Sequence, residues 1–491
     1  MKVLFQQAKN GQLTAILNNI YLHSSYNPMR EAQRYVENIN VSYSPSLILV
    51  LEPGLSYIIP LLRKRFPDSK IGIIRYLQDF QNFNYDADYI FNYFEHKSDF
   101  ENFLFNTLGE EKIFGALVLQ WQPSSKIFPE IENNILISIK NSMEKAKTLL
   151  VTREFFEKKW FLNSCNFVKY VNSTVSIRKK IDIPIVIISS GPSLKESLNI
   201  IKNNREKIFI ICLSSAIKVC LYNNITPDLC VSTDGGFWAG EHLKCLTDKN
   251  IPLALPLEGF CQKNILEKNK ILPLIYSDGI SKYIADISNI PVLEAERNGT
   301  VSGTALILAM SISSNDIYFC GLDMSSQNGF QHCQPNEIEL NNSIKDTRIN
   351  SKEKRISISQ YSKGVLSIYK EWFDFLNLNG RKVYRVIEKK YKNNTLGFIK
   401  DLSTNDFSYN LSNLNAFNNN DYFTDVIWKK NLKQISVYLL ENLKKGKWIK
   451  NIFPLSMTSL SHNKNNTDIK NRLENDFHSL LKKTENILNE H

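Results

Sequence analysis

The sequence predicts an α/β protein, and three observations support this class. Short apolar runs bounded by turn residues alternate with helical patterns over residues 1–150. The same alternation recurs more strongly over 151–400, and apolar residues at helical spacing dominate 401–491. Strands that alternate with helices form a parallel, doubly wound sheet. We therefore predict a Rossmann-like amino-terminal domain over 1–150, a central doubly wound α/β domain over 151–400 and a carboxyl-terminal helical region over 401–491.

The amino-terminal segment has strand patterns at 47–51, 71–74 and 113–119 and helical patterns from 57 and over 129–149. Gly54 and Ser56 follow the first strand, at the edge where such a sheet holds a nucleotide. The glycine signal is thin, and we favour a degenerate nucleotide fold that serves as a scaffold.

The central segment has the strongest strand signals. Buried strands are predicted at 185–188, 207–213, 228–231, 253–255, 272–275 and 317–320, and a helix at 302–310. Continuous apolar runs of this kind are typical of parallel strands that are covered on both faces.

Two helices are predicted beyond an Asn-rich loop at 410–420, because apolar residues recur there at helical spacing. One apolar stripe contains Trp428, Leu432, Ile435, Leu439 and Leu443, and the other contains Ile469, Leu473, Phe477, Leu480 and Leu488. We interpret both as packing faces, with partner binding as the lesser alternative.

Composition excludes several classes. No apolar stretch approaches the ~18–20 residues that span a bilayer, and Met1–Gln7 turns polar before a secretion signal could form. The eight cysteines include no C-x-x-C pair, which favours reduced core residues of a cytoplasmic protein. The net charge of +11 comes from lysines scattered among asparagines, so we predict no nucleic-acid binding. A positive surface could still favour anionic nucleotide substrates.

The segment 185–194 carries the clearest site signal. A predicted strand runs directly into Ser189, Ser190, Gly191, Pro192 and Ser193, and a helical pattern follows. Helix-start amides and the helix dipole together attract phosphate or carboxylate. Pro192 suits the first helical position, and Ser193 with Glu196 has capping-box spacing. The segment matches neither a Walker site nor a dinucleotide fingerprint, and an ordinary strand-to-helix turn is the equal alternative.

Further polar residues follow other central strands. Asp234 and Gly235 come after strand 228–231, and Asp323 comes after strand 317–320. Asp234 could meet a ribose hydroxyl or a metal-bound diphosphate, although an isolated Asp at a strand end is more often a cap or turn residue.

Two loop residues are candidates for proton transfer. His332 lies in a polar loop and could act as a general base or acid, with a solvated loop histidine as the alternative. Tyr361 precedes Ser362 and Lys363, and its hydroxyl could stabilise a departing phosphate or assist proton transfer. An exposed turn is the equal alternative for Tyr361.

Taken in order, these segments resemble the motility-associated-factor (Maf) glycosyltransferases, bacterial proteins with a central DUF115 domain. The resemblance covers nearly the whole chain, with Pro53 and Ser56 standing where the family has glycine or other small residues. Its blocks are His23–Ala32, Leu51–Tyr57, Ser189–Leu194, Pro227–Asp234, Gly299–Ala305 and Gly321–Asp323 followed by His332.

The resemblance implies transfer of a nonulosonic acid, of the pseudaminic or legionaminic type, from a CMP-activated donor to Ser or Thr of flagellin in the cytoplasm. No cofactor would be obligatory, Mg²⁺ would be optional, and the protein would not insert into a membrane. The sequence leaves the oligomeric state open. The central domain also resembles bacterial sialyltransferases, in which a histidine before Ser-Lys is the base. Tyr361 stands at that place here, so we take His332 as the substitute base.

The mechanism that follows is a hypothesis. Loop 189–193 and the amides after it hold the CMP phosphate, and Asp234 with Gly235 contacts the ribose or orients that loop. Ser302, Gly303 and Thr304 bind the sugar carboxylate or the phosphate, while Asp323 and His332 approach the acceptor hydroxyl. No metal ligands are assigned.

Two alternatives remain. The central domain also resembles the archaeal 6-hydroxymethylpterin diphosphokinase, in which Asp234 would bind magnesium and ATP would be the donor. A non-catalytic flagellin-binding factor that kept the fold is the other alternative.

Overall fold

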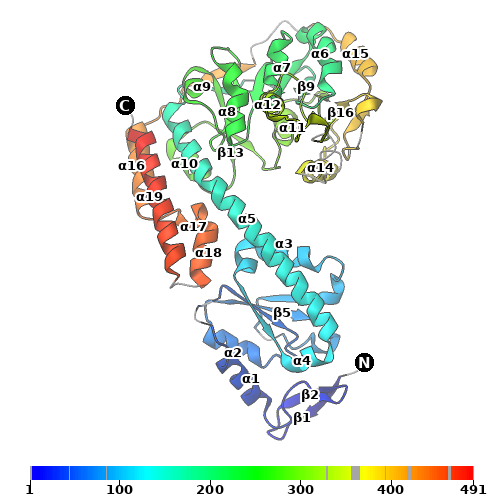
Figure 1. Cartoon of the computed structure of the whole chain (residues 1–491), viewed down its shortest axis with the longest axis vertical. Helices are drawn as coiled ribbons and strands as arrows, with labels where there is room; N and C mark the ends of the chain where they lie inside the picture. Colours follow the sequence, from blue (N-terminus) through cyan, green and yellow to red (C-terminus); the bar gives the residue numbers. More distant parts are fainter. Residues whose placement is uncertain are drawn as a thin grey trace. The chain divides into compact units, whose positions relative to one another are not determined.

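The computed structural model describes residues 3–41, 43, 45–84, 86–178, 180–327, 330–354, 365–392, 394–416, 422–462 and 466–489. The chain forms two compact units. Unit 1 contains Met1–Glu157 and Lys447–Leu480, and unit 2 contains Lys158–Gly446 and Leu481–His491. The predicted α/β class is confirmed (Figure 1). The segment 401–491, predicted as one helical region, is divided between the units and includes a strand.

Unit 1 contains a small antiparallel sheet, β1-β2-β3, and a parallel sheet in the order β6-β5-β4-β7. Its strands are β1 (Leu4–Gln7), β2 (Leu13–Leu17), β3 (Ile20–Tyr21), β4 (Leu47–Leu51), β5 (Lys70–Arg75), β6 (Tyr89–Asn92) and β7 (Ala116–Gln120). Its helices are α1 (Pro28–Glu37), α2 (Ile58–Arg65), α3 (Phe100–Phe114), α4 (Gln122–Ile127), α17 (Ile449–Ile452) and α18 (Pro454–His462). The boundary with unit 2 falls within α5 (Pro129–Tyr170) and α19 (Thr467–Asn489).

The parallel sheet of unit 1 is covered on both faces. Successive β4 residues point to opposite faces, as in any strand. Leu49 packs into a core cluster with residues of α3 and α5, whereas Val50 packs into a cluster with α1 and α2. The predicted strand 113–119 starts later than expected, because Ile113 lies in the last turn of α3 and packs into the first cluster from the helix. The apolar run 113–119 therefore forms both the end of α3 and most of β7.

Unit 2 is built on one large sheet in the order β17-β16-β15-β9-β10-β11-β12-β13-β8-β18, with β14 paired to β13. Its strands are β8 (Thr174–Ile177), β9 (Ile185–Ile188), β10 (Phe209–Leu213), β11 (Leu229–Val231), β12 (Leu253–Pro256), β13 (Ile271–Tyr276), β14 (Leu293–Ala295), β15 (Ile317–Cys320), β16 (Val383–Val386), β17 (Lys400–Leu402) and β18 (Phe423–Val426). The predicted central strands are therefore confirmed to within about two residues at each end.

The α-helices of unit 2 alternate with these strands. They are α6 (Leu194–Asn203), α7 (Ile217–Tyr222), α8 (Phe237–Leu243), α9 (Lys263–Lys268), α10 (Gly279–Ser288), α11 (Val301–Ile312), α12 (Glu337–Lys345), α14 (Val365–Phe375), α15 (Thr404–Ser412) and α16 (Leu432–Lys444). The predicted helix 302–310 is α11, and the two predicted carboxyl-terminal helices are α16 and α19, of which α19 crosses the boundary between the units. All residues of β9 and β10 are buried, because helices cover both faces of the sheet. Ile211 of β10 shares a core cluster with α11, whereas Cys212 contacts Cys220 of α7.

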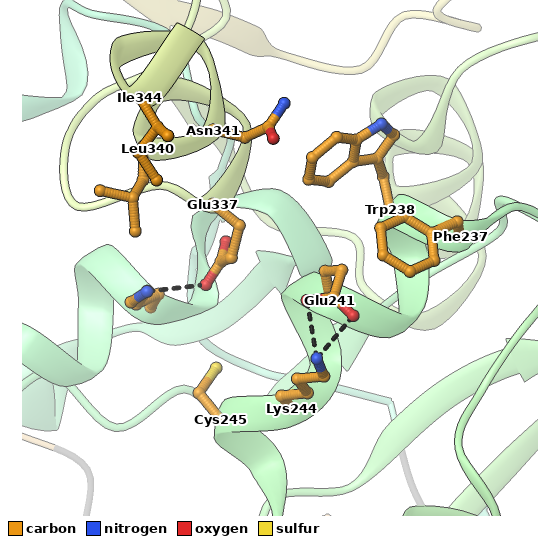
Figure 2. Close-up of a pocket in the computed structure, with 10 residues that line it drawn as sticks. Phe237, Trp238, Glu241, Lys244, Cys245, Glu337, Leu340, Asn341 and Ile344 are labelled. Carbon is orange, nitrogen blue, oxygen red and sulfur yellow. Dashed lines mark hydrogen bonds and ion pairs between the residues drawn. The ribbon is translucent and has the colours of Figure 1, made fainter.

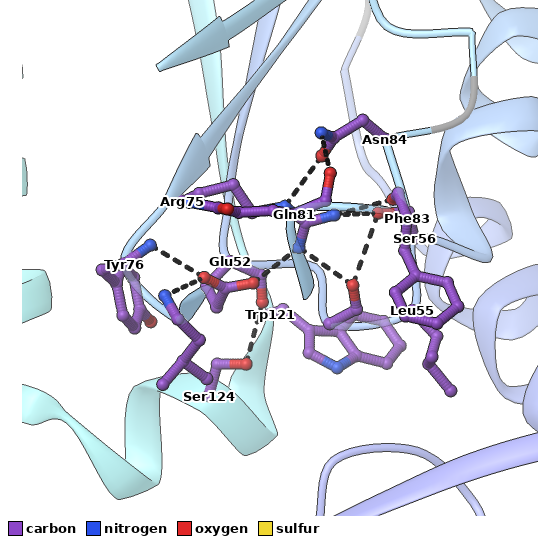
Figure 3. Close-up of polar contacts among 12 residues, drawn as sticks. Glu52, Leu55, Ser56, Arg75, Tyr76, Gln81, Phe83, Asn84, Trp121 and Ser124 are labelled. Atoms are coloured by element: carbon purple, nitrogen blue, oxygen red, sulfur yellow. Dashed lines mark hydrogen bonds and ion pairs between the residues drawn. The ribbon is translucent and has the colours of Figure 1, made fainter. Parts of the chain in front are cut away.

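The turn after β4 in unit 1 is held by one buried arginine (Figure 3). Nη1 of Arg75 donates to Glu52 Oε1 (2.6 Å) and to Gly54 O (2.9 Å), and Nη2 donates to Ser56 Oγ (2.6 Å) and to Phe83 O (2.7 Å). The remaining Nε donor bonds to Asn84, so all five guanidinium N–H groups are used. Gly54 and Ser56, which the sequence places at a nucleotide edge, are thus engaged by the protein itself. This arrangement fits the scaffold interpretation.

His23 lies against the same turn and is fully buried. Its Nε2 accepts a hydrogen bond from Leu55 N (2.9 Å), and its ring packs edge-on against Tyr57 at a centroid distance of 5.4 Å. Burial, and then the positive charge of Arg75, lower the pKa of His23 to about 3. The folded state therefore keeps this imidazole neutral at pH values where an exposed histidine is charged.

Acidification below about pH 6.5 is expected to destabilise unit 1 through His23. The unfolded chain takes up this proton near pH 6.5, whereas the folded chain resists it until about pH 3. The free energy of unfolding therefore rises with pH across that window, by about 1.4 kcal/mol per pH unit from this group. Denaturant unfolding of the wild type and of His23→Gln at about pH 7, 5.5 and 4 checks this, because the variant should lose less stability on acidification. Equal losses would contradict it.

Candidate functional site

The candidate site lies where the strand order of the unit 2 sheet reverses. The chain proceeds from β9 outward through β10 to β13, and then returns to place β15 on the other side of β9. Cys320 of β15 pairs in parallel with Ile188 of β9, so the loops that follow the two strands emerge side by side. Open α/β sheets bind ligands in the crevice at such a switch point. Two of the predicted site segments, 189–193 and 321–323, therefore meet there.

The two loops are hydrogen-bonded to each other. Ser189 N donates to Cys320 O (2.8 Å), and Gly191 N donates to Gly321 O (2.8 Å). Ser193 N donates to Asp323 Oδ2 (2.7 Å), and the Ser193 hydroxyl donates to Asp323 Oδ1. The prediction that this turn presents unpaired amides to a phosphate is therefore wrong for Ser189, Gly191 and Ser193. Their donors are used within the protein, and the carboxylate of Asp323 occupies the place expected for an external anion.

The start of α6 also differs from the prediction. The helix begins at Leu194, so Pro192 precedes it rather than taking its first position. Ser193 makes no capping hydrogen bond to the helix, because its hydroxyl is directed to Asp323. The Glu196 carboxylate accepts hydrogen bonds from Lys390 Nζ (2.8 Å) and Tyr391 Oη (3.1 Å) instead of closing a capping box.

Burial shifts the pKa of Asp323. Desolvation raises it, and the two hydrogen bonds from Ser193 oppose that rise. Both carboxylate oxygens of Asp323 are engaged by Ser193, and the side chain is only 4% exposed. The predicted approach of Asp323 to an acceptor hydroxyl is therefore not supported by its geometry. Asp323 instead positions the loop before α6.

Four serines at this edge form two hydroxyl pairs, and we call these four residues the serine cluster. Ser189 Oγ lies 3.5 Å from Ser302 Oγ at the start of α11, and Ser215 Oγ donates to Ser190 Oγ at 2.9 Å. All four side chains are largely buried, yet each hydroxyl can both donate and accept. These side-chain hydroxyls, unlike the amides of Ser189, Gly191 and Ser193, therefore keep hydrogen-bonding capacity.

Two backbone amides at the start of α11 are hydrogen-bonded within the helix itself. Thr300 is the N-cap, and its hydroxyl accepts from Gly303 N (2.9 Å), while Thr304 N donates to Thr300 O (3.2 Å). The predicted amide donors at Gly303 and Thr304 are therefore satisfied internally. The hydroxyl of Ser302 remains directed at the serine cluster.

Asp234 and Gly235 lie after β11 on the same edge of the sheet. Asp234 is exposed, and its Oδ1 accepts Gly236 N at 2.9 Å, which is the turn role expected of an isolated Asp. A side chain at Gly235 would collide with the Trp160 ring, so this glycine serves close packing. Contact of either residue with a ribose stays a prediction.

His332 is held against the first loop and oriented by a buried glutamate. Cys333 N donates to Ser190 O (2.6 Å), which fixes the His332 loop beside the serine cluster. Nδ1 of His332 lies 3.1 Å from Oε1 of Glu339, whose side chain is 2% exposed. Burial raises the pKa of Glu339, but hydrogen bonds from His332 and from Gln331 N outweigh it, and the net pKa is lowered. An ionised Glu339 accepts a proton-bearing Nδ1 and leaves Nε2 of His332 as a base.

Tyr361, with Ser362 and Lys363, lies outside the described residues. Glu339 was missed by the sequence analysis, because a glutamate in the first turns of a helix has the pattern of a solvated residue. The sequence signal near Glu339 is Asn336, a residue type that favours helix starts. The Asn336 side chain accepts hydrogen bonds from Ile338 N and Glu339 N. Within the described residues, no group of three or more His, Cys, Asp and Glu side chains is placed to hold a metal ion.

The central part of the chain is similar to a known protein family. Residues 159–329 match the family of MptE-like proteins, described as 6-hydroxymethylpterin diphosphokinase MptE-like. This stretch contains β8 through β15 and most of the candidate site, although His332 lies just beyond it. The DUF115-type resemblance of the central segment is thereby confirmed.

The chain is also similar to one curated bacterial protein in sequence and to one solved structure in fold. The chain is 30% identical over 235 residues to an uncharacterized protein of Treponema pallidum (strain Nichols), covering 48% of this chain and 52% of that protein. The match thus spans about half the length of that relative. A solved Maf glycosyltransferase from Magnetospirillum magneticum AMB-1 has the same fold, with a TM-score of 0.51, 12% identity and coverage of 99% of this chain and 90% of that chain. The resemblance predicted from the sequence is confirmed at the level of fold.

No helix among the described residues combines the length and apolar character needed to cross a membrane.

Gly321→Ala is expected to destabilise unit 2 more than Gly380→Ala. Both glycines have positive φ, 80° and 75°, so alanine costs about 1 kcal/mol of backbone strain at either. A Cβ at Gly321 would also overlap Ser189 O, whereas nothing lies within 4 Å of one at Gly380. We expect a loss of about 2–4 kcal/mol at Gly321 and about 1 kcal/mol at Gly380 in denaturant unfolding. Similar losses would argue against the close crossing of the two loops.

Proposed function

We propose that this protein is a glycosyltransferase that moves a nonulosonic acid from a CMP-activated donor to a Ser or Thr hydroxyl of flagellin. The observation that carries the proposal is the His332–Glu339 pair, fixed beside the serine cluster at the switch point of the sheet. The fold shared with a Maf glycosyltransferase supports the reaction class. The donor, the sugar and the acceptor come from the sequence resemblance.

In this proposal His332 removes the proton of the acceptor hydroxyl. Within the described residues, Nε2 of His332 makes no hydrogen bond, whereas Nδ1 is committed to Glu339. Glu339 fixes the tautomer and stabilises the imidazolium that forms, in the way a buried carboxylate supports a catalytic histidine. The acceptor oxygen forms a bond to the anomeric carbon as the bond to the CMP phosphate breaks.

The leaving phosphate is stabilised by the serine cluster. Hydroxyls of Ser189, Ser190 and Ser302 can turn their O–H groups toward the phosphate oxygens, and their burial strengthens each hydrogen bond. Asp323 acts indirectly, because it holds Ser193 and so sets the position of the first loop. No obligatory metal enters this mechanism, and Mg²⁺ is optional.

A diphosphokinase is the second candidate, favoured by the family match over residues 159–329. In that case ATP is the donor, a hydroxymethylpterin is the acceptor, and exposed Asp234 contacts magnesium. The two candidates differ in the nucleotide that stabilises the fold.

His332→Ala is expected to lower the rate of sugar transfer by about 10²–10⁴-fold while the affinity for CMP stays within about twofold. Glu339→Gln should give a smaller loss, because an amide still accepts from Nδ1 but does not stabilise the imidazolium by charge. Intact-mass spectrometry of flagellin incubated with each variant and the CMP-sugar measures the transfer. His478→Ala, in α19 and exposed, is the matched control. Full transfer by His332→Ala would remove this residue from the mechanism.

Nucleotide selectivity distinguishes the two candidates. A ligand at about 100 times its dissociation constant stabilises a fold by about 2.7 kcal/mol, which thermal unfolding detects. CMP without magnesium should raise the melting temperature if the proposal is right. A rise with ATP and magnesium, and none with CMP, would replace it by the diphosphokinase.

A further inference from the structure

A groove lies between α8 and α12 in unit 2, next to the candidate site (Figure 2). Its volume is about 570 Å³, within the range of ligand pockets. One wall is a single face of α12, and the other comes from α8 and the turn after it. The lining residues are Glu337, Leu340, Asn341 and Ile344 on one side, Phe237, Trp238, Glu241, Lys244 and Cys245 on the other, with Lys218 of α7.

The walls expose large apolar side chains to the groove. Phe237 is 65% exposed, Leu340 57% and Ile344 75%. Leu340 and Ile344 lie one helical turn apart, and Figure 2 shows Trp238 on the opposite side of the groove from Leu340. Single exposed apolar residues are ordinary, but a contiguous group that lines a cavity marks a binding surface.

The charges in the groove are compensated within the protein. Glu337 is paired with Lys218 (3.1 Å) and with buried His242 (2.7 Å). Lys244 is paired with Glu241 (2.6 Å). The two lysines therefore face carboxylates already, and the groove is poorly suited to a phosphate or a sugar carboxylate. Its electrostatics suit an uncharged, apolar occupant.

The helix α12 contributes residues both to the groove and to the candidate site. α12 presents Leu340 to the groove, while the preceding residue, Glu339, is buried and holds His332. The N-cap Asn336 donates to Ser215 O (2.9 Å), and the Ser215 hydroxyl donates to Ser190 Oγ within the serine cluster. The groove and the proposed base are therefore held by different faces of the same helix.

We propose that the groove binds the acceptor polypeptide through apolar side chains close to the hydroxyl that is modified. This inference rests on the proposed function, because it assigns the acceptor part of that reaction. The donor remains at the switch point, where hydroxyls are available. The groove supplies apolar contacts that a sugar nucleotide cannot use and that a polypeptide segment can.

The double variant Leu340→Ser/Ile344→Ser tests this assignment. Both side chains are more than half exposed, so the fold should be retained, and circular dichroism checks that it is. Removal of two apolar contacts should raise the KM for flagellin at least about tenfold, with kcat at saturating flagellin and CMP affinity unchanged. Ile349→Ser, which is 82% exposed but does not line the groove, is the control and should behave as the wild type.

Direct binding separates this inference from the proposed function. Fluorescence anisotropy of labelled monomeric flagellin, without nucleotide, should show at least about tenfold weaker binding by the double variant whether or not the chain transfers sugar. Equal binding by variant and wild type, or no binding by the wild type, overturns the groove assignment. Weaker CMP binding by the variant would assign the groove to the donor instead. Loss of self-association in the variant, by sedimentation, would assign it to a second copy of the chain.

Discussion

The contact between Asp323 and Ser193 is the constraint on which the candidate site depends. Asp323 follows β15 and reaches across to the loop after β9, where it accepts both the amide and the hydroxyl of Ser193. Gly191 and Gly321 make this possible, because a side chain at either position would collide with the opposite loop. The resulting loop presents Ser190 O to Cys333 N, so the position of His332 depends on the same contact.

Unit 1 also has a buried carboxylate that connects two loops at the edge of its parallel sheet, and this residue is Glu52. Glu52 follows β4, the strand at which the order of its sheet reverses, and its Oε2 accepts Tyr76 N and Leu77 N at 2.8 Å each. Arg75 neutralises the charge of Glu52 at 2.6 Å. In both units a buried carboxylate that follows a parallel strand accepts backbone N–H groups of a neighbouring loop. In unit 1 this leaves a closed scaffold, whereas unit 2 retains hydroxyls and a histidine at the edge.

The sequence was sufficient for the six central strands of the unit 2 sheet, β9 to β13 and β15, because they are continuous apolar runs. The strands β8, β14, β16, β17 and β18 contain polar residues and were not predicted. β9 and β15 have the predicted limits, since burial on both faces leaves no alternation to misread. The predicted site segments 189–193 and 321–323 meet at one edge of the sheet, but the amides predicted as donors at Ser189, Gly191 and Ser193 are used within the protein. Helix-start spacing indicates amides, yet it carries no sign that Asp323, 130 residues away in the chain, will use them. The contact between Glu339 and His332 could not be predicted for a similar reason, because only tertiary packing buries Glu339 against that histidine.

These contacts divide the polar groups of the edge into two kinds. Asp323 and Glu339 act on the protein, one on a loop and the other on an imidazole, and each is buried. The serine hydroxyls and Nε2 of His332 retain capacity for a ligand. The proposed transfer needs donors for the departing phosphate and a base for the acceptor hydroxyl, and the serine hydroxyls and Nε2 of His332 are the groups that keep this capacity. The hydrogen bonds from Ser193 fix the Asp323 side chain without cancelling a negative charge, so the role of Asp323 in the proposed reaction is to position the loop.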